Sequence, residues 1–470
     1  MAVEAALDLS KNSCDIIYWV TTPRTNIELA KSNFPKTIFH DFGRVLSCIP
    51  PEELKYLENS LPDKELISKM FETESMVIMM MFKKYGYLSI GERKLFYYHL
   101  LGYWSEVLKK FKPDVIVYPA QPHIVYDFIV YSLANLYGIK NIFFNFTRIG
   151  DRLLLTNDLK VGSLKLKKIL AEQASKNDFD LSDLEPDIKE LFLKESSKEN
   201  SIPLDTEEII NRYKGVDFFR RKLKILLNSF KDLSFFKKIF LHCVRWFRGD
   251  LIREYKSVQS VPSFNKNFIY VPLQYQPEGS TNPLGGIFLD QTFMIETLAS
   301  SLPEGWGIYV KEHPTQWLPR GPIFFDYRYR GYYEKISKVK GVKIVPVNYD
   351  HHILLERCKS VGTVTGTGGW EVLFYGKPTL IFGYPWYRHA PGVLYVDGPE
   401  SCKREIKKIE AGFRVDKKEI IKYLVAFGKS SVRAYLEDYC MRISSLTPEE
   451  NKNNLVKAIL EDINQNLSQK

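Results

Sequence analysis

A loop rich in glycine and threonine carries the clearest chemical signal in the sequence. It follows the short apolar run 360–364 and precedes a helix predicted from Trp370, and it consists of Thr365, Gly366, Thr367, Gly368 and Gly369. Glycines let a backbone approach an anion closely, and helix N-terminal N–H groups and threonine hydroxyls add donors. The segment therefore predicts a phosphate-binding loop. Glu371, in the first helical turn, is predicted to reach a ribose diol or to complement the helix dipole.

Two ionisable side chains are predicted at the end of a strand in the same region. Lys311 and His313 lie two residues apart at the end of the β-rich run 307–311, so alternation places both on one face. Pro314 ends the strand ladder and leaves His313 at its carboxyl end. A cation and an imidazole beside a phosphate loop favour a functional role over a purely structural one.

A third polar segment follows the predicted strand 268–273. Loops after parallel strands gather at the carboxyl edge of a sheet, so this segment is expected near the other two. The predicted ligand contacts in it are Gln276, Glu278 and Ser280. The alternative interpretation is that these polar residues only form a turn.

Together these motifs resemble those of a known family. The runs Y-Q-P-E-G-S-T, V-K-E-H-P and T-V-T-G-T-G-G-W-E-V-L-x-x-G-K-P resemble bacterial capsule polysaccharide biosynthesis proteins. Those proteins are similar to the Kdo and sialic-acid transferases of the GT-B fold. The resemblance is close over 262–400 and looser over 119–158. It implies a glycosyltransferase with a nucleotide-sugar donor and a glycan or lipid-linked glycan acceptor.

The resemblance also implies roles for particular residues. In such relatives the histidine of the His-Pro pair and the later Ser/Thr-rich loop bind the donor phosphate, which implies this role for His313, Thr365 and Thr367. The donor is a substrate, and neither a separate cofactor nor a metal is implied. Thr-Gly-Thr replaces the serine pair common in sialyltransferases, so CMP-linked and UDP-linked donors both stay open. An epimerase of the same fold and a non-catalytic polysaccharide export accessory are the rival functions.

A glycosyl transfer also needs a base that deprotonates the acceptor hydroxyl. Three candidates follow predicted strands in the first part of the chain: His123, Asp127 four residues later on the same helix face, and Asp151. Each has a structural alternative, such as a helix start for His123 or a pairing of Asp151 with Arg152. The sequence does not select one of them.

The alternation of strand and helix patterns predicts the architecture that must position these residues. It is typical of an α/β protein, and with the resemblance it predicts a GT-B-like fold in which two doubly wound Rossmann-like domains face a cleft. The predicted divisions are an acceptor-side domain over 1–160, a helical insertion over 161–261, a nucleotide-sugar-binding domain over 262–416 and C-terminal helices over 417–470.

Positive charge is concentrated in one segment. Between Arg212 and Lys256 there are thirteen Lys and Arg against four Asp and Glu, a local net charge of +9 beside +10 for the whole chain. Eight Phe and Trp residues are interleaved with them. This composition suits an anionic membrane surface. The alternative is a helical segment with its aromatics on its own core. No nucleic-acid motif accompanies the patch, so nucleic acid is not an expected partner.

Overall composition limits the class of protein. With 45% hydrophobic and 26% charged residues over 470 positions, the chain is neither disordered nor fibrous. Apolar runs stay far below the roughly 18 residues of a membrane span, and the first residues lack the pattern of a signal peptide. Six scattered cysteines without a CxxC pair argue against disulfides or zinc. We therefore expect a cytoplasmic protein peripherally associated with the inner membrane.

Overall fold

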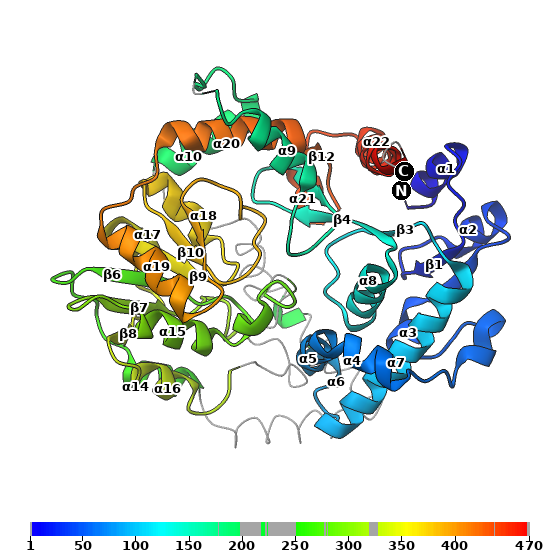
Figure 1. The fold of residues 1–470 in the computed structure, drawn as a ribbon, viewed down its shortest axis with the longest axis horizontal. Helices are drawn as coiled ribbons and strands as arrows, with labels where there is room; N and C mark the ends of the chain where they lie inside the picture. Colours follow the sequence, from blue (N-terminus) through cyan, green and yellow to red (C-terminus); the bar gives the residue numbers. More distant parts are fainter. Residues whose placement is uncertain are drawn as a thin grey trace. The chain divides into compact units, whose positions relative to one another are not determined.

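The protein forms two compact units, residues 1–172 with 426–470 and residues 173–425 (Figure 1). The computed structural model describes residues 2–176, 178–197, 218–220, 223, 251–276, 279, 281–318, 328–436 and 438–467. The basic-aromatic segment between Arg212 and Lys256 therefore lies mostly outside the described residues. The domain boundaries expected from the sequence stay a prediction.

The second unit is built on a six-stranded sheet with the order β11-β10-β9-β6-β7-β8, in which every pairing is parallel. Counted along the chain from the first of these strands, the order is 3-2-1-4-5-6, which is the doubly wound order of nucleotide-binding sheets. The strand order reverses between β6 and β9, and ligands of such sheets bind at that point. The strands are β6 (Phe268–Pro272), β7 (Gly307–Lys311), β8 (Val342–Ile344), β9 (Ser360–Thr363), β10 (Thr379–Ile381) and β11 (Val393–Tyr395).

Helices cover both faces of this sheet because residues on both faces of its strands are apolar. Ile269 and Ile308 pack in a core with residues of α15 (Gln291–Ser300), α16 (Tyr332–Ser337) and α19 (Pro399–Glu410). Tyr270 and Tyr309, one position further on, pack in a second core with α17 (His351–Arg357) and η3 (Val372–Tyr375). The strands are therefore buried on both sides, as expected of a parallel sheet. The expected α/β class is confirmed.

The first unit has less regular sheets than the sequence indicated. β1 (Tyr18–Thr21) and β2 (Ile38–Asp41) form a parallel pair, and a four-stranded sheet has the order β12-β5-β4-β3. Its parallel part is β3 (Val115–Tyr118), α8 (Val125–Tyr137) and β4 (Lys140–Phe146), which confirms the predicted strand–helix–strand unit. Its antiparallel strands are β5 (Arg152–Thr156) and β12 (Val432–Arg433).

The C-terminal segment returns to the first unit. Helices were expected over 417–470, but this segment also contains a strand, because β12 separates α20 (Lys417–Ser430) from α21 (Asp438–Ile443) and pairs with β5. α22 (Pro448–Leu467) then lies beside α1 (Ala2–Lys11), as Figure 1 shows. Leu455 and Ile459 of α22 pack on β4 and β5, so the last helix completes the core of this sheet.

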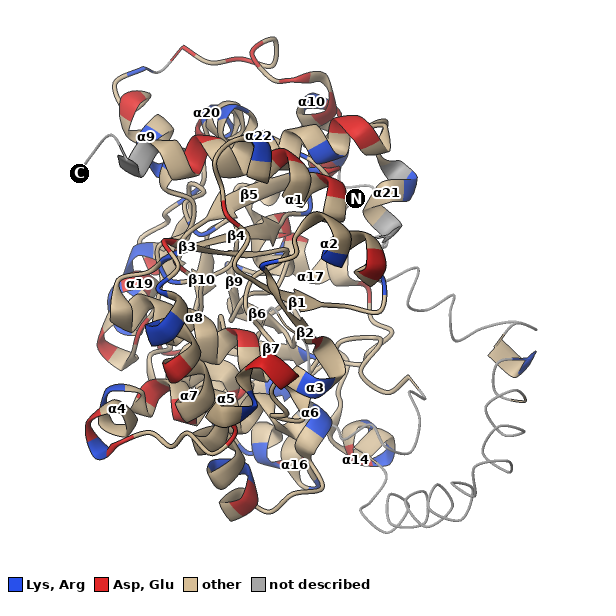
Figure 2. Cartoon of the chain, turned by 90° about the vertical axis from the view of Figure 1, so that its right-hand side faces the viewer, with Lys and Arg blue, Asp and Glu red and all other residues tan. Residues whose placement is uncertain are grey.

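The remaining helices of the described chain are mostly short and amphipathic. The longest helix among the described residues is α7 (Ile90–Phe111), which begins at a capping box formed by Ser89 and Glu92. Both basic and acidic residues occur along α4 (Lys64–Lys69) and α19 (Figure 2). The others are α2 (Ile27–Asn33), α3 (Phe42–Leu46), η1 (Glu52–Leu57), α4 (Lys64–Lys69), α5 (Phe71–Met80), α6 (Phe82–Tyr85), α9 (Leu164–Glu172), α10 (Pro186–Ser197), α14 (Leu251–Val258), η2 (Gly286–Leu289) and α18 (Gly368–Glu371).

A search of the described helices for one long and apolar enough to cross a membrane finds none.

Candidate functional site

The loops after β6 and β9 meet at the reversal point of the second unit's sheet. In the orientation that pairs both ends of its amide, Gln274 accepts from the Gly366 N–H at 3.0 Å and donates to Gln291 Oε1 at 3.2 Å. The Gln291 side chain also accepts from the backbone N–H of Gln274 at 2.8 Å and donates to the backbone carbonyl of Gln274 at 3.0 Å. Buried glutamines thus fix the two loops to each other and to the start of α15.

The glycines of the second loop are required by the packing of the protein itself. A methyl group on Gly366 would lie 2.8 Å from Thr363 Oγ1, and one on Gly368 would lie 2.9 Å from Pro272 Cγ. One on Gly369 would lie 2.8 Å from Thr379 Oγ1. Tight packing of the turn therefore accounts for these glycines. They do not by themselves show that the loop binds an anion. The helix after it begins at Gly368, two residues before the predicted start.

The two threonines of the loop differ in their surroundings. Thr365 is buried, and its Oγ1 has no hydrogen-bond partner among the described residues. Thr367 is half-buried and caps the helix through its carbonyl, which accepts from the Trp370 and Glu371 N–H groups at 2.9 Å each. A buried hydroxyl without a partner is unfavourable unless water or a ligand supplies one. Of the two, Thr365 is therefore the better placed to bind a ligand.

Lys311 ends β7 with its side chain in the interior. It is 7% exposed, and across the described part of the chain its ammonium has no hydrogen-bond or ion-pair partner. Burial lowers the pKa of Lys311 to about 8, and the nearby Asp350 carboxylate opposes part of this effect. A buried cation that lacks a paired anion is a candidate for binding an anionic ligand.

His313 follows β7 and is held in one tautomer. Its Nδ1 lies 3.2 Å from the Thr315 N–H and 2.8 Å from the Thr315 hydroxyl. A backbone N–H can only donate, so Nδ1 accepts and the neutral ring carries its proton on Nε2. The ring lies beside Tyr275, with the centroids 6.2 Å apart. His313 therefore presents an N–H donor on Nε2.

Glu371 is paired with a histidine that the sequence interpretation did not select. His351 Nε2 lies 2.8 Å from Glu371 Oε2, and His351 Nδ1 lies 2.8 Å from the Tyr270 hydroxyl. Because an ionised carboxylate only accepts, Nε2 carries a proton. Asp350 is the N-cap of the helix that begins at His351, and its side chain accepts from the His352 N–H at 2.8 Å. The sequence feature that could have identified His351 is its position at the start of a helix that follows a strand.

Gln276 is buried and has structural partners. Its Nε2 donates to Leu289 O at 2.8 Å, and its Oε1 accepts from Arg328 at 2.6 Å. Its backbone exchanges hydrogen bonds with the Gln316 amide at 3.0 Å and 2.9 Å. These contacts position the loop after β6. Glu278 and Ser280, the other predicted residues of that loop, lie outside the described residues.

The structure places the three candidate bases in different surroundings in the first unit. Asp127 is buried and accepts from the Ile124 N–H at 2.7 Å, and burial raises its pKa well above the ordinary range. Asp151 accepts from the Ser444 hydroxyl at 2.5 Å and pairs with Arg433 at 3.4 Å, so it anchors the returning C-terminal segment. His123 is half-buried after β3, with Nδ1 2.7 Å from a backbone carbonyl.

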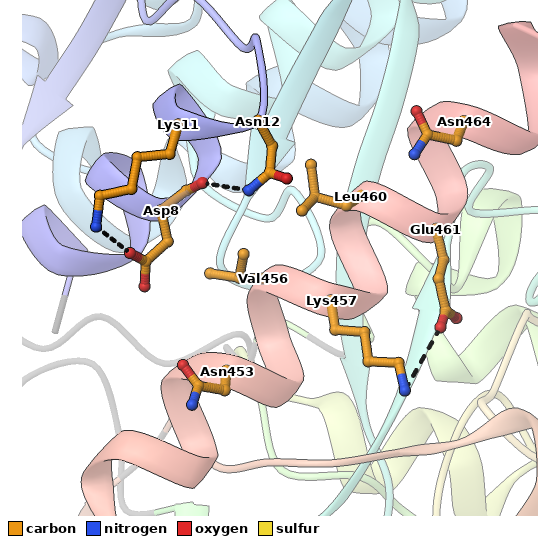
Figure 3. A pocket seen from close by; sticks show the side chains of 9 residues that line it. All are labelled: Asp8, Lys11, Asn12, Asn453, Val456, Lys457, Leu460, Glu461 and Asn464. Atoms are coloured by element: carbon orange, nitrogen blue, oxygen red, sulfur yellow. Dashed lines mark hydrogen bonds and ion pairs between the residues drawn. The ribbon is translucent and has the colours of Figure 1, made fainter.

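An open hollow of about 440 Å³ between α1 and α22 of the first unit is lined by none of these residues. Figure 3 shows that amide and charged side chains line it, with Lys11 paired to Asp8 and Lys457 to Glu461. Charges of both signs are already matched there, and the sheet edges that carry the candidate residues do not contribute to it. Separately, the described residues contain no group of three or more His, Cys, Asp or Glu arranged to hold a metal ion.

Comparison with known proteins confirms the resemblance seen in the motifs. The sequence model of the family described as "Capsule polysaccharide biosynthesis protein" matches residues 256–414, which hold the whole parallel sheet of the second unit and all three motifs. No curated protein matches the chain.

Solved structures give only distant likenesses. The KpsC β-Kdo 2,7 transferase of Thermosulfurimonas dismutans is 13% identical, with 76% of this chain and 89% of that chain covered and a TM-score of 0.32. The UDP-GlcNAc 2-epimerase of Neisseria meningitidis, bound to UDP-GlcNAc, is 12% identical, with 98% and 96% covered and a TM-score of 0.24. The UDP-GlcNAc 2-epimerase of Methanocaldococcus jannaschii is 14% identical, with 73% and 82% covered and a TM-score of 0.26. Scores this low carry no argument about activity.

Proposed function

We propose that the chain is a glycosyltransferase of capsule or surface polysaccharide synthesis that binds a nucleotide-sugar donor on its second unit. The observation that carries the proposal is Lys311, a buried lysine at the carboxyl end of a doubly wound sheet whose ammonium has no hydrogen-bond or ion-pair partner among the described residues. The phosphate of a nucleotide supplies the missing negative charge. The family match over 256–414 includes this site.

In this proposal the second unit acts on the leaving phosphate. Negative charge develops on that phosphate as the glycosidic bond breaks, and donors fixed in advance stabilise it. Lys311 supplies a cation, His313 supplies its Nε2–H, and the Thr365 hydroxyl supplies a third donor. Thr315 holds the His313 ring in the required tautomer. The chemistry is of the GT-B kind and uses no metal.

The donor and acceptor are proposed by class. A CMP-linked Kdo- or sialic-acid-like sugar is the leading donor, and a UDP-linked sugar is the alternative. The acceptor is a glycan or lipid-linked glycan on the first unit, with the base drawn from His123, Asp127 and Asp151. The protein would act at the cytoplasmic face of the inner membrane, held there by the basic-aromatic segment.

The first test is a thermal-shift titration with CMP, UDP and GDP. A ligand present at one hundred times its dissociation constant stabilises the folded state by about 2.7 kcal/mol. We expect one of these nucleotides to raise the melting temperature of wild type and to lose this effect in Lys311→Met. Lys343→Met removes an exposed lysine of β8 and serves as the matched control. If no nucleotide stabilises wild type, the proposed donor site is wrong.

The second test separates the proposal from its rivals. Removing one stabilising donor typically lowers turnover about 10²-fold, so His313→Ala should do so while its melting temperature is kept. Nucleotide release that requires an added acceptor glycan supports transfer, whereas product from the donor alone favours an epimerase. Wild-type polysaccharide export in cells that carry His313→Ala would favour the non-catalytic accessory.

A further inference from the structure

An asparagine that neither motif nor comparison singles out has an entirely unsatisfied side chain. Asn282 is 6% exposed, and neither Nδ2 nor Oδ1 has a hydrogen-bond partner in the described part of the chain. Buried side-chain amides are nearly always hydrogen-bonded, because an unmade bond leaves the full cost of desolvation. An amide with both ends unmade therefore indicates a ligand or an ordered water that completes it.

A second buried polar group without a partner among the described residues lies on the glycine-rich loop, which packs against the turn that holds Asn282. Asn282 belongs to the turn 281–285, and the hydroxyl of Thr365 also has no hydrogen-bond partner among the residues that the structure describes. A methyl group on Gly383 would meet Leu284 O at 2.5 Å and Thr365 Cγ2 at 3.0 Å, so the turn and Thr365 lie against the same glycine. The Tyr384 N–H fixes the turn there by donating to Leu284 O at 3.0 Å.

We propose that Asn282 binds a neutral, hydrogen-bonding part of the donor substrate, next to the phosphate that Thr365 contacts. This inference rests on the proposed function and adds a second subsite to it. The amide offers two N–H donors and one carbonyl acceptor. An anion suits only the donors, whereas a group that both donates and accepts satisfies the whole side chain. Two parts of a nucleotide sugar have this chemistry: the hydroxyl groups of the sugar and the edge of the pyrimidine base.

The placement also explains why the residue is left unsatisfied. A site built to hydrogen-bond a polar group rejects analogues that lack it, because its own buried groups then stay unpaired. The cost of holding the amide without a partner in the empty protein is recovered when the donor binds. Asn282 is thus inferred to be a specificity-determining residue of the donor site.

The test measures stability and affinity together, with Asn282→Ala and wild type. Removing an unsatisfied amide should leave the melting temperature of the ligand-free protein unchanged or raise it. The same change should weaken donor binding by about tenfold, the value of one good buried hydrogen bond. The control is Asn145→Ala on β4 of the first unit, because Asn145 is also buried and its Oδ1 also has no partner in the described part of the chain. We expect no change in affinity from the control.

Two ligand arms identify the bound group. Titrations with CMP and UDP report the nucleotide alone, and titrations with CMP-sialic acid and UDP-GlcNAc report the nucleotide with a sugar. A loss confined to the sugar conjugates assigns Asn282 to the sugar, and an equal loss in both assigns it to the base; either result supports the inference. Unchanged affinity for every ligand that wild type binds means that water completes the amide, and the inference is wrong. Wild type that binds none of the four contradicts the proposed function itself.

Discussion

Arg328 and Glu312 form an ion pair whose two side chains are completely buried, with Nε 2.8 Å from Oε2. The carboxylate also accepts from the Tyr333 hydroxyl at 2.6 Å and from the backbone N–H of His313 at 2.7 Å. The guanidinium also donates to Gln274 O at 3.1 Å. This pair therefore ties the loop after β6 to the loop after β7, and both loops carry candidate site residues.

Breaking this pair is expected to destabilise the second unit strongly. Loss of one partner leaves the other charge buried and unpaired, which typically costs about 3–5 kcal/mol. Arg328→Met should lower the free energy of unfolding in urea by that amount. Lys69→Met, which breaks the exposed pair with Glu65, is the control and should leave the free energy of unfolding nearly unchanged, because exposed ion pairs contribute little. Similar small losses in both variants would show that the buried pair does not hold the loops.

The depressed pKa of Lys311 predicts a pH-dependent stability. Its folded pKa is about 8 and its ordinary value is 10.5, so between these values the unfolded chain binds more protons than the folded one. Stability therefore rises with pH across this window, by at most about 3 kcal/mol from this group. Lys311→Met should remove the rise and should be the more stable protein at pH 7. Urea unfolding at pH 7, 8 and 9 measures both effects.

The same lysine predicts how nucleotide binding depends on pH. The ammonium is lost as pH rises through about 8 in the free protein, so nucleotide affinity should fall above that pH. Lys311→Arg keeps its charge throughout this range and should flatten the profile. Parallel profiles for wild type and Lys311→Arg would remove Lys311 from the nucleotide site.

The three candidate bases should separate by their effects on stability. Asp151→Asn weakens the anchor to Ser444 and Arg433, and Asp127→Asn weakens the start of α8, so both should lower the melting temperature. His123 holds its Nδ1 2.7 Å from the Gln121 carbonyl after β3, and we expect His123→Ala to lose transfer with a smaller change in melting temperature than either aspartate variant. Near-wild-type transfer by all three variants would place the base elsewhere.

Much of the second unit follows from local sequence patterns. Apolar runs bounded by turn residues predicted β6, β7 and β9 within about one residue, because strands buried on both faces are continuously apolar. β11 was not predicted, since a three-residue edge strand carries little pattern. In the first unit β12 was missed for a different reason: its pairing with β5 is a long-range contact that the helical pattern of the tail does not encode.

Side-chain partners were the least predictable part of the candidate site. The motifs located Lys311, His313 and Thr365, but Gln276 has the same polar character and is committed to structural contacts. The pairing of His351 with Glu371 depends on the crossover from β8 to β9, which brings α17 beside the glycine-rich loop. Sequence spacing does not reveal which distant chain segments share a sheet edge.

The basic-aromatic segment between Arg212 and Lys256 is expected to bind anionic membranes. Its local net charge of +9 accounts for nearly all of the +10 of the chain, and each Lys or Arg near an anionic surface contributes about 1 kcal/mol of binding. We expect wild type to cosediment with anionic liposomes at low salt and to be partly released by added salt. Aromatic insertion should leave a fraction that salt does not release.

Charge reversal within the segment should abolish this binding. The variant changes Arg220, Arg221, Lys222, Lys237 and Lys238 to Glu. The matched control makes the same change of net charge at exposed lysines of α19 and α20, namely Lys403, Lys407, Lys417, Lys418 and Lys429. Binding that survives in the control and is lost in the variant locates the membrane contact in the segment, because the two proteins carry the same net charge. Equal binding by variant and wild type, or none by wild type at low salt, would leave the segment as an ordinary solvated surface.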